Sequence, residues 1–282
     1  MRKMGKISTY FKRGIQYVTK GTPKVNIKVN LAQIHYGGIL EGKKILITGG
    51  TRGLGFAIAK RCLEEKAKVT ITGRTMEALT KAKQALGNNK NLFLIEHDIR
   101  NYDQDYDVVQ KARRFMGGVD ILLNNAGISV HEINYATCTQ QMWDDQMDTN
   151  LKGVYFLTQA FMKYYDEVGK KEGKILNMVS ERGLYGDDVP YGLAKRALIS
   201  YTEGLAVRLI TKGIRVNAIA PGVTATDMTG HSPDGDLYRR YARGKRVLLP
   251  EEIAEVTVFL MSDAANCISG QVIACNEANH LK

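Results

Sequence analysis

Residues 43–67 read KKILITGGTRGLGFAIAKRCLEEKA, and this stretch decides the fold. It begins with a short apolar run that ends in glycines, and from Phe56 onward the apolar residues recur at helical spacing. The stretch therefore predicts a strand, a glycine-rich turn and a helix, in that order.

The same alternation continues toward the C-terminus. Short apolar runs that end in polar or glycine-rich residues recur at 68–73, 91–98, 119–127, 173–180 and 214–222, and helical segments separate them. Buried strands that alternate with helices indicate a parallel sheet covered on both faces. We therefore expect an α/β fold, a doubly wound parallel sheet of the Rossmann type, as a single domain over residues 42–282. Ligands of such sheets bind at the carboxyl ends of the strands.

The net charge of +11 belongs mainly to an N-terminal arm, residues 1–41. Residues 1–40 carry eight basic and no acidic side chains, whereas residues 41–282 carry 32 basic and 29 acidic ones. A nearly neutral main domain argues against nucleic acid as a partner. The arm predicts a basic amphipathic helix followed by a half-buried strand. Three roles remain open for it: peripheral membrane contact, partner binding, or packing on its own domain or a sister subunit.

The four cysteines (Cys62, Cys138, Cys267 and Cys275) are scattered without the spacing of metal ligands. We expect no metal site and no disulfide framework. Reduced thiols of this kind are typical of a cytoplasmic protein.

The turn TGGTRGLG, residues 48–55, has the chemistry of a phosphate-binding loop. Gly49, Gly53 and Gly55 allow a tight turn, close approach of a phosphate and close packing of helix on sheet. The N-terminus of the following helix offers unpaired N–H groups and the positive end of its dipole to a pyrophosphate.

The end of the second predicted strand, TGRT, indicates which dinucleotide binds. An NAD-binding fold commonly places an acidic residue here to bind the ribose 2′-hydroxyl, but this chain has Arg74. With Arg52 nearby, two guanidinium groups would bracket a 2′-phosphate, which suits their fork geometry. The cofactor is therefore predicted to be NADP(H) in preference to NAD(H).

Five motifs in order resemble the short-chain dehydrogenase/reductase family, over about residues 42–275. They are the glycine loop 48–55, HDI at 97–99, NNAG at 124–127, Asn150 within MDTNLKGVY, and PGVTATDM at 221–228. The resemblance implies a set of cofactor-binding residues: Gly49, Thr51, Arg52, Gly53, Leu54, Gly55, Arg74, Asp98, Ile99, Asn125, Ala126, Gly127, Tyr191, Lys195, Pro221, Gly222, Val223 and Thr226. It is strongest to the branch that contains 3-oxoacyl-carrier-protein reductases and sugar or steroid dehydrogenases.

The segment SERGLYGDDVPYGLAK, residues 180–195, holds two candidate catalytic tyrosines. A carbonyl reductase needs a proton donor whose pKa lies closer to neutrality than the phenol value of about 10. Tyr191 has Lys195 four residues later in a predicted helix, so both share one face and the ammonium would lower the pKa of the phenol. Tyr185 has no such neighbour. Asp187 or Asp188 is expected to cap this helix, with Pro190 near its first position.

The family's catalytic set carries over to four residues. Ser180 stabilises the carbonyl oxygen, and Tyr191 donates or accepts the proton. Lys195 lowers the pKa of the tyrosine and binds the nicotinamide ribose. Asn150 helps to hold a water that relays protons to the solvent.

The chain departs from its relatives where the substrate binds. Ser180 and Tyr191 are eleven residues apart, about two fewer than is usual, and the C-terminal sequence VIACNEANHLK also differs. Arg182, His131 and the basic stretch 238–246 would suit an anionic substrate, or else form a solvated helix face.

The sequence thus predicts an NADPH-dependent reductase of a ketone or aldehyde, of the 3-oxoacyl type, on a small-molecule or carrier-bound substrate. The alternatives are a sugar or polyol dehydrogenase that runs toward oxidation, and a non-catalytic NADP-binding scaffold that works through the basic arm. The resemblance also implies a homo-oligomer, a dimer or a tetramer.

Overall fold

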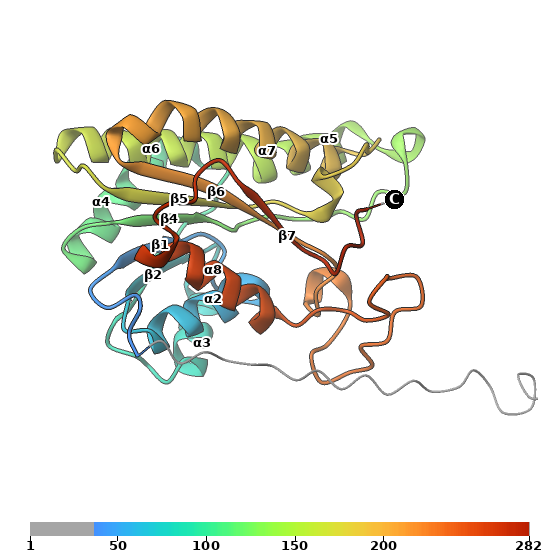
Figure 1. The fold of residues 1–282 in the computed structure, drawn as a ribbon, viewed down its shortest axis with the longest axis horizontal. Coiled ribbons are helices and arrows are strands. Elements are labelled where there is room, and N and C mark those ends of the chain that lie inside the picture. Colours follow the sequence, from blue (N-terminus) through green and yellow to red (C-terminus); the bar gives the residue numbers. More distant parts are fainter. Residues whose placement is uncertain (1–36, 282) are drawn as a thin grey trace, which may run out of the picture.

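The computed structural model describes residues 37–281, so the helix and strand predicted for the N-terminal arm lie outside the described residues. Within this range one parallel sheet forms the centre of the molecule, in the strand order β3-β2-β1-β4-β5-β6-β7 (Figure 1). The strands are β1 Lys44–Ile47, β2 Lys68–Gly73, β3 Leu92–Glu96, β4 Ile121–Asn124, β5 Gly173–Met178, β6 Ile214–Pro221 and β7 Val272–Cys275. The predicted doubly wound α/β sheet is confirmed, and the edge strand β7 is an addition to it.

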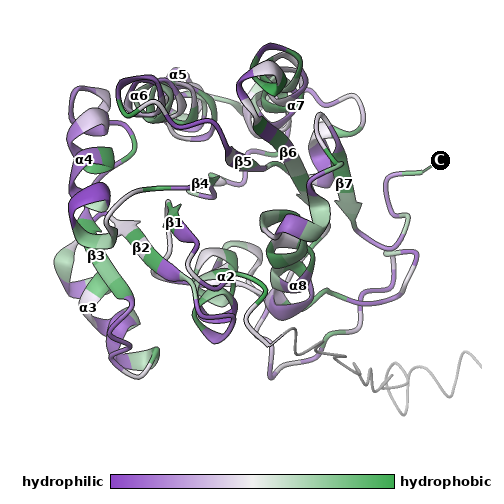
Figure 2. Ribbon diagram, turned by 60° about the vertical axis from the view of Figure 1, so that its left-hand side comes forward, coloured by the Kyte–Doolittle hydropathy of each residue, from purple (hydrophilic) through white to green (hydrophobic). Residues whose placement is uncertain are grey.

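Helices cover both faces of the sheet, as Figures 1 and 2 show. One apolar layer packs α2 (Gly53–Glu64), α3 (Met76–Ala85) and α8 (Pro250–Met261) on the sheet. The other packs α4 (Asp105–Met116), α6 (Gly153–Glu167) and α7 (Pro190–Leu209), and α5 (Gln140–Met147) lies against α7. The strands are nearly continuous in apolar residues because both of their faces are buried. In the described part of the chain, no helix is long and apolar enough to cross a membrane.

The strand order reverses between β1 and β4, which both lie at the centre of the sheet. The loops that leave these two strands therefore part to opposite sides and open a crevice at the carboxyl edge. Hydrogen bonds join the two loops at their base: Asn125 Nδ2 donates to the carbonyl oxygens of Thr48 (2.8 Å) and Gly49 (3.0 Å). This edge is where the sequence motifs converge.

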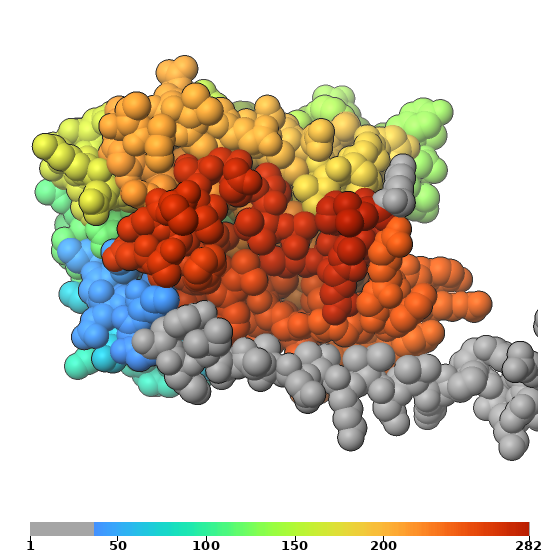
Figure 3. All heavy atoms as spheres, viewed as in Figure 1, coloured from blue at the N-terminus to red at the C-terminus, as the bar shows by residue number. Residues whose placement is uncertain are grey.

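A long segment, residues 222–249, connects β6 to α8 and lies beside the crevice. A small apolar cluster of Ala225, Leu237 and Val247 holds it together. Figure 3 shows the C-terminal residues packed against it, and Arg246 pairs with Glu277 across this contact.

Candidate active site

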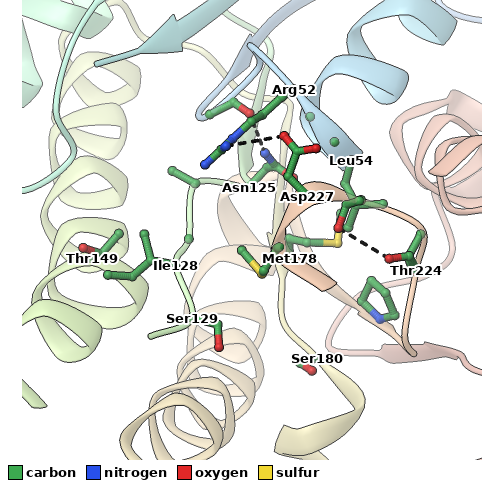
Figure 4. A pocket seen from close by; sticks show the side chains of 18 of the residues that line it. Arg52, Leu54, Asn125, Ile128, Ser129, Thr149, Met178, Ser180, Thr224 and Asp227 are labelled. Atoms are coloured by element: carbon green, nitrogen blue, oxygen red, sulfur yellow. Dashed lines mark hydrogen bonds and ion pairs between the residues drawn. The ribbon is translucent and has the colours of Figure 1, made fainter. Parts of the chain in front are cut away.

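The carboxyl edge of the sheet holds a cleft of about 1080 Å³. Every residue predicted to bind the cofactor or act in catalysis lines it, except Asn150, which lies fully buried beneath. Figure 4 shows side chains from several elements facing this space, among them Arg52, Asn125, Met178 and Ser180. Residues far apart in the sequence are thus brought together in one site.

The glycine-rich loop has the backbone that the motif predicts. Gly49 has φ of 66° and Gly53 φ of 56°, both in the left-handed region that favours glycine. A Cβ on Gly55 would lie 2.3 Å from the carbonyl oxygen of Gly49, so only glycine lets α2 pack this closely on the loop.

The N-terminus of α2 suits an anion. Its first turn contains no acidic residue, and no side chain caps it. Since the first N–H groups of a helix have no partner within it, they and the helix dipole present positive charge to the cleft. This donor set and the glycine loop fit the pyrophosphate of a nicotinamide dinucleotide.

Three arginines, Arg52, Arg74 and Arg100, line the cleft near the glycine-rich loop and the ends of β2 and β3. Arg74 is exposed and makes no ion pair within residues 37–281, whereas Arg52 lies 3.4 Å from Asp227 across the cleft (Figure 4). Arg100, which the sequence analysis did not identify, binds Asp98 (2.7 Å) and Asp145 (3.4 Å). The hydrogen bond from Arg100 holds the pKa of Asp98 below its usual value. Arg74 is therefore the most available cation at this end.

Ser180, Tyr191 and Lys195 meet at the opposite end of the cleft. Ser180 follows β5, and Tyr191 and Lys195 lie in the first turns of α7. The Lys195 ammonium donates to the carbonyl oxygen of Met178 (2.9 Å) and lies 5.7 Å from the centre of the Tyr191 ring. Burial lowers the pKa of Lys195 to about 8.

The pKa of Tyr191 is raised overall, contrary to the net lowering expected from the neighbouring Lys195. Burial is the main cause, because a phenolate loses its solvation there. A hydrogen bond from Ser180 and the charge of Arg182 act in the opposite direction but do not outweigh burial. Burial thus shifts the pKa of each group toward its neutral form, upward for Tyr191 and downward for Lys195.

Asn150 lies in a π-helical turn, Asp148–Lys152, that joins α5 to α6. Its side chain accepts from the Ile128 N–H and donates to the Ile128 carbonyl, both at 3.0 Å. A Cβ on Gly127 would lie 2.8 Å from Asn150 Oδ1 and 3.5 Å from the Lys195 ammonium. Asn150 therefore supports the loop after β4, next to Lys195.

The predicted cap of α7 is wrong. Neither Asp187 nor Asp188 caps the helix, which begins at Pro190 as expected. The Asp187 carboxylate instead accepts two bonds from Arg182, from Nε (2.6 Å) and Nη2 (2.7 Å). The Tyr191 N–H donates to Glu132 Oε1 (3.0 Å), a residue the sequence analysis missed.

The basic stretch 238–246, expected either to face an anionic substrate or to form a solvated helix face, is not helical. Residues 238–246 form a turn between bridged Tyr238 and Arg246, and within it only Arg239 lines the cleft, as His131 and Arg182 do. The C-terminal residues Asn276 and Asn279 bind the buried Glu181. Chain from near the C-terminus thus supports Glu181, which lines the cleft.

Known proteins resemble this chain in sequence and in fold. The sequence model of the short chain dehydrogenase family matches residues 43–236. The chain is 34% identical over 246 residues to the 3-oxoacyl-[acyl-carrier-protein] reductase FabG of Chlamydia trachomatis, covering 84% of this chain and 97% of that protein.

Solved structures agree. The structure of 3-ketoacyl-(acyl-carrier-protein) reductase from Brucella melitensis complexed with NADH is 29% identical with a TM-score of 0.78, covering 86% of this chain and 100% of that one. The structure of ElxO with NADP bound is 28% identical with a TM-score of 0.77, covering 85% of this chain and 99% of that one. The chain therefore belongs to the short-chain dehydrogenase/reductase family, as an oxidoreductase that acts on carbonyl or hydroxyl groups.

Proposed function

We propose that this protein is an NADPH-dependent reductase of a ketone or aldehyde, with a 3-oxoacyl thioester, free or carrier-bound, as its substrate class. The observation that carries the proposal is the division of one cleft into two ends. Ser180, Tyr191 and Lys195 converge at one end, and the glycine loop with Arg52 and Arg74 forms the other. The similarity to reductases of acyl-carrier-protein substrates supports the substrate class.

A bound nicotinamide dinucleotide would supply the hydride. In this proposal Ser180 donates a hydrogen bond to the carbonyl oxygen, and the Tyr191 phenol donates the proton as that oxygen gains charge. The raised pKa of Tyr191 keeps the phenol protonated at neutral pH, which suits a proton donor. Lys195 binds the ribose and stabilises the phenolate that remains. Asn150 holds the loop around Gly127 and, by resemblance, the water that returns a proton to Tyr191.

The substrate can be identified by following NADPH consumption across a panel: 3-oxoacyl thioesters, quinones and sugar ketones, with the matching alcohols and NADP⁺ for the reverse direction. We expect the highest kcat/KM with a 3-oxoacyl thioester. A higher kcat/KM with sugar or polyol substrates would replace that class with a dehydrogenase. No turnover with any of them would favour a non-catalytic NADP-binding scaffold.

The pH dependence of reduction follows from Lys195. Its pKa of about 8 means that it loses its charge above that pH, while the raised pKa of Tyr191 keeps the phenol protonated. We expect kcat/KM for reduction, which reports the free enzyme, to fall as the pH rises through about 8. The residual activity of Lys195→Arg, whose charge is permanent, should not fall in this range. The same decline in that variant would assign it to another group.

We also propose that the protein is a homo-oligomer. The outer surfaces of α6 and α7 expose Tyr155 (45%), Leu193 (38%) and Val207 (80%), and the tilted rings of Tyr155 and Tyr201 pack together between the two helices. Exposed apolar side chains on adjacent helices are typical of subunit contacts.

Placing a charge on this surface should weaken the association. We expect Val207→Asp to lower the mass measured by light scattering, whereas Met76→Asp, a matched exposed apolar position on α3, should leave it as in the wild type. Equal masses for Val207→Asp and the wild type would rule out this surface.

Since the four cysteines are free thiols, we place the protein in the cytoplasm.

A further inference from the structure

We infer that Glu132 is a positioning residue for this reaction: it caps the helix that carries Tyr191 and, through Gln146, helps to hold Asn150 in place. The inference rests on the proposed function, since it assumes that Tyr191 is the proton donor. Glu132 itself does not line the cleft, although His131 beside it does. It therefore acts through other residues and not on the substrate.

The first contact is with the start of α7. This 20-residue helix has Val189 at its N-cap, whose side chain accepts no hydrogen bond from the helix. Pro190 has no N–H to satisfy, so the Tyr191 N–H is the first donor of the helix, and it binds Glu132 Oε1 at 3.0 Å. A carboxylate from a loop 59 residues away thus takes the place of a local cap.

The second contact runs through an amide to Asn150. Gln146 Nε2 donates to both carboxylate oxygens of Glu132, at 3.0 and 2.9 Å. Gln146 Oε1 accepts from Asn150 Nδ2 at 2.7 Å. Asn150 in turn binds both backbone groups of Ile128, so the chain of bonds returns to the loop that carries Glu132. Gln146 and Asn150 are 0% exposed and Glu132 is 8% exposed.

The bonds from Glu132 through Gln146 to Asn150 form a relay whose directions agree from both ends: Glu132 is an acceptor at one end, and the backbone N–H and carbonyl of Ile128 fix Asn150 at the other. An ionised carboxylate only accepts, so Gln146 must turn its N–H₂ toward it and its oxygen toward Asn150. Asn150 must then present its N–H₂ to Gln146, which leaves its oxygen for the Ile128 N–H. A glutamine at 132 that turned its N–H₂ toward Gln146 would face the N–H₂ that Gln146 keeps on that side because of Asn150, so a buried donor would lose its partner.

The buried charge of Glu132 is tolerated because of its surroundings. It forms no ion pair in the part of the chain that the structure describes, but it lies at the N-terminus of α7, where the helix dipole favours an anion. The groups that act on Tyr191 are Arg182, Glu132 and Glu181, with Lys195 beside the ring. Of these, the charge of Glu132 contributes to raising the pKa of the phenol.

Two variants separate the two contacts, with 3-oxobutanoyl and 3-hydroxybutanoyl thioesters of N-acetylcysteamine and NADP(H) as probes. Glu132→Gln removes the charge and the acceptor-only end of the relay, and Gln146→Leu removes the relay but keeps the charge. We expect each to lower kcat by about 10-fold, because a buried donor or acceptor is left unpaired. KM for NADPH should stay within about 2-fold of the wild-type value. The double variant should lose far less than the product of the two single losses.

The pH profile of oxidation gives the readout that a purely structural role would not move. In that direction the rate rises as Tyr191 loses its proton, so removal of the Glu132 charge should shift the rise of kcat to lower pH. Gln146→Leu should leave the midpoint unchanged. Glu96→Gln is the matched control. Like Glu132, Glu96 accepts from the first N–H of a helix (Met76, 2.6 Å) and does not line the cleft, but that helix carries none of the proposed catalytic residues. It should change neither kcat nor the midpoint.

Glu132→Gln with a wild-type kcat and an unshifted midpoint would overturn the inference, as would Gln146→Leu with a wild-type kcat. A lower melting temperature alone would assign Glu132 to helix capping and would also contradict the positioning role. Tyr191→Phe is measured alongside. If that variant remains active, the proposed function fails; if it is inactive while Glu132→Gln behaves as the wild type, only this inference fails.

Discussion

Replacing Tyr191 by Phe is expected to lower kcat for carbonyl reduction by about 10²–10⁴-fold, the usual contribution of a positioned general acid. The substitution removes one hydroxyl from a half-buried ring at the catalytic end of the cleft and leaves the packing of α7 intact. Because most of the residues proposed to bind NADPH lie elsewhere in the cleft, its Kd should change little. Steady-state kinetics and a fluorescence titration with NADPH would measure the two effects separately.

Tyr185→Phe is the matched comparison, since Tyr185 lines the same cleft and its ring is also partly buried. Loss of its hydroxyl should reduce kcat by less than about tenfold, the range of one ordinary hydrogen bond. A larger loss in Tyr185→Phe than in Tyr191→Phe would exchange the roles of the two tyrosines. Full activity in both variants would mean that neither tyrosine is the proton donor.

The cofactor preference should reverse on replacing Arg74 by Asp. This exposed guanidinium has no ion pair within the described residues and is available for a 2′-phosphate, whereas an aspartate there would repel the phosphate and accept from a 2′-hydroxyl. We expect kcat/KM for NADPH to fall by about 100-fold, equivalent to two charged hydrogen bonds, while that for NADH rises.

Arg100→Met tests whether any arginine at this end would have the same effect. The Arg100 guanidinium is already held by Asp98 and Asp145, so its loss should alter the NADPH/NADH ratio by less than about tenfold. An equal effect of Arg74→Asp and Arg100→Met would mean that the general positive charge of this end, and not Arg74, selects the cofactor.

The sequence was most informative where local chemistry decides the structure. A left-handed backbone at Gly49 and a close approach at Gly55 demand glycine, so these positions are visible as motifs. The strands between them are short apolar runs because they are buried on both faces, and their order along the chain predicts a parallel sheet. The ligand site follows, since all parallel strands end at one edge.

Predictions from the sequence were wrong where the partners or the burial of a side chain decide the outcome. Asp187 precedes α7 and resembles a cap, but it pairs with Arg182, whose two donors bind a carboxylate more strongly than one backbone N–H does. Lys195 stands one turn from Tyr191, as predicted, but the pKa of the phenol depends on how much water the fold excludes. Neither outcome is encoded in the spacing of the residues.

Residue types, their periodicity and the glycine positions thus determined the sheet, the dinucleotide cleft and the residues that line it, because backbone sterics and the burial of strands act over a few residues. Only the tertiary structure decided the direction in which the pKa values of Tyr191 and Lys195 shift, the cap of α7, and the relay from Glu132 through Gln146 to Asn150. Desolvation and the pairing of polar groups depend on which distant segments meet, and those contacts exist only after the chain has folded.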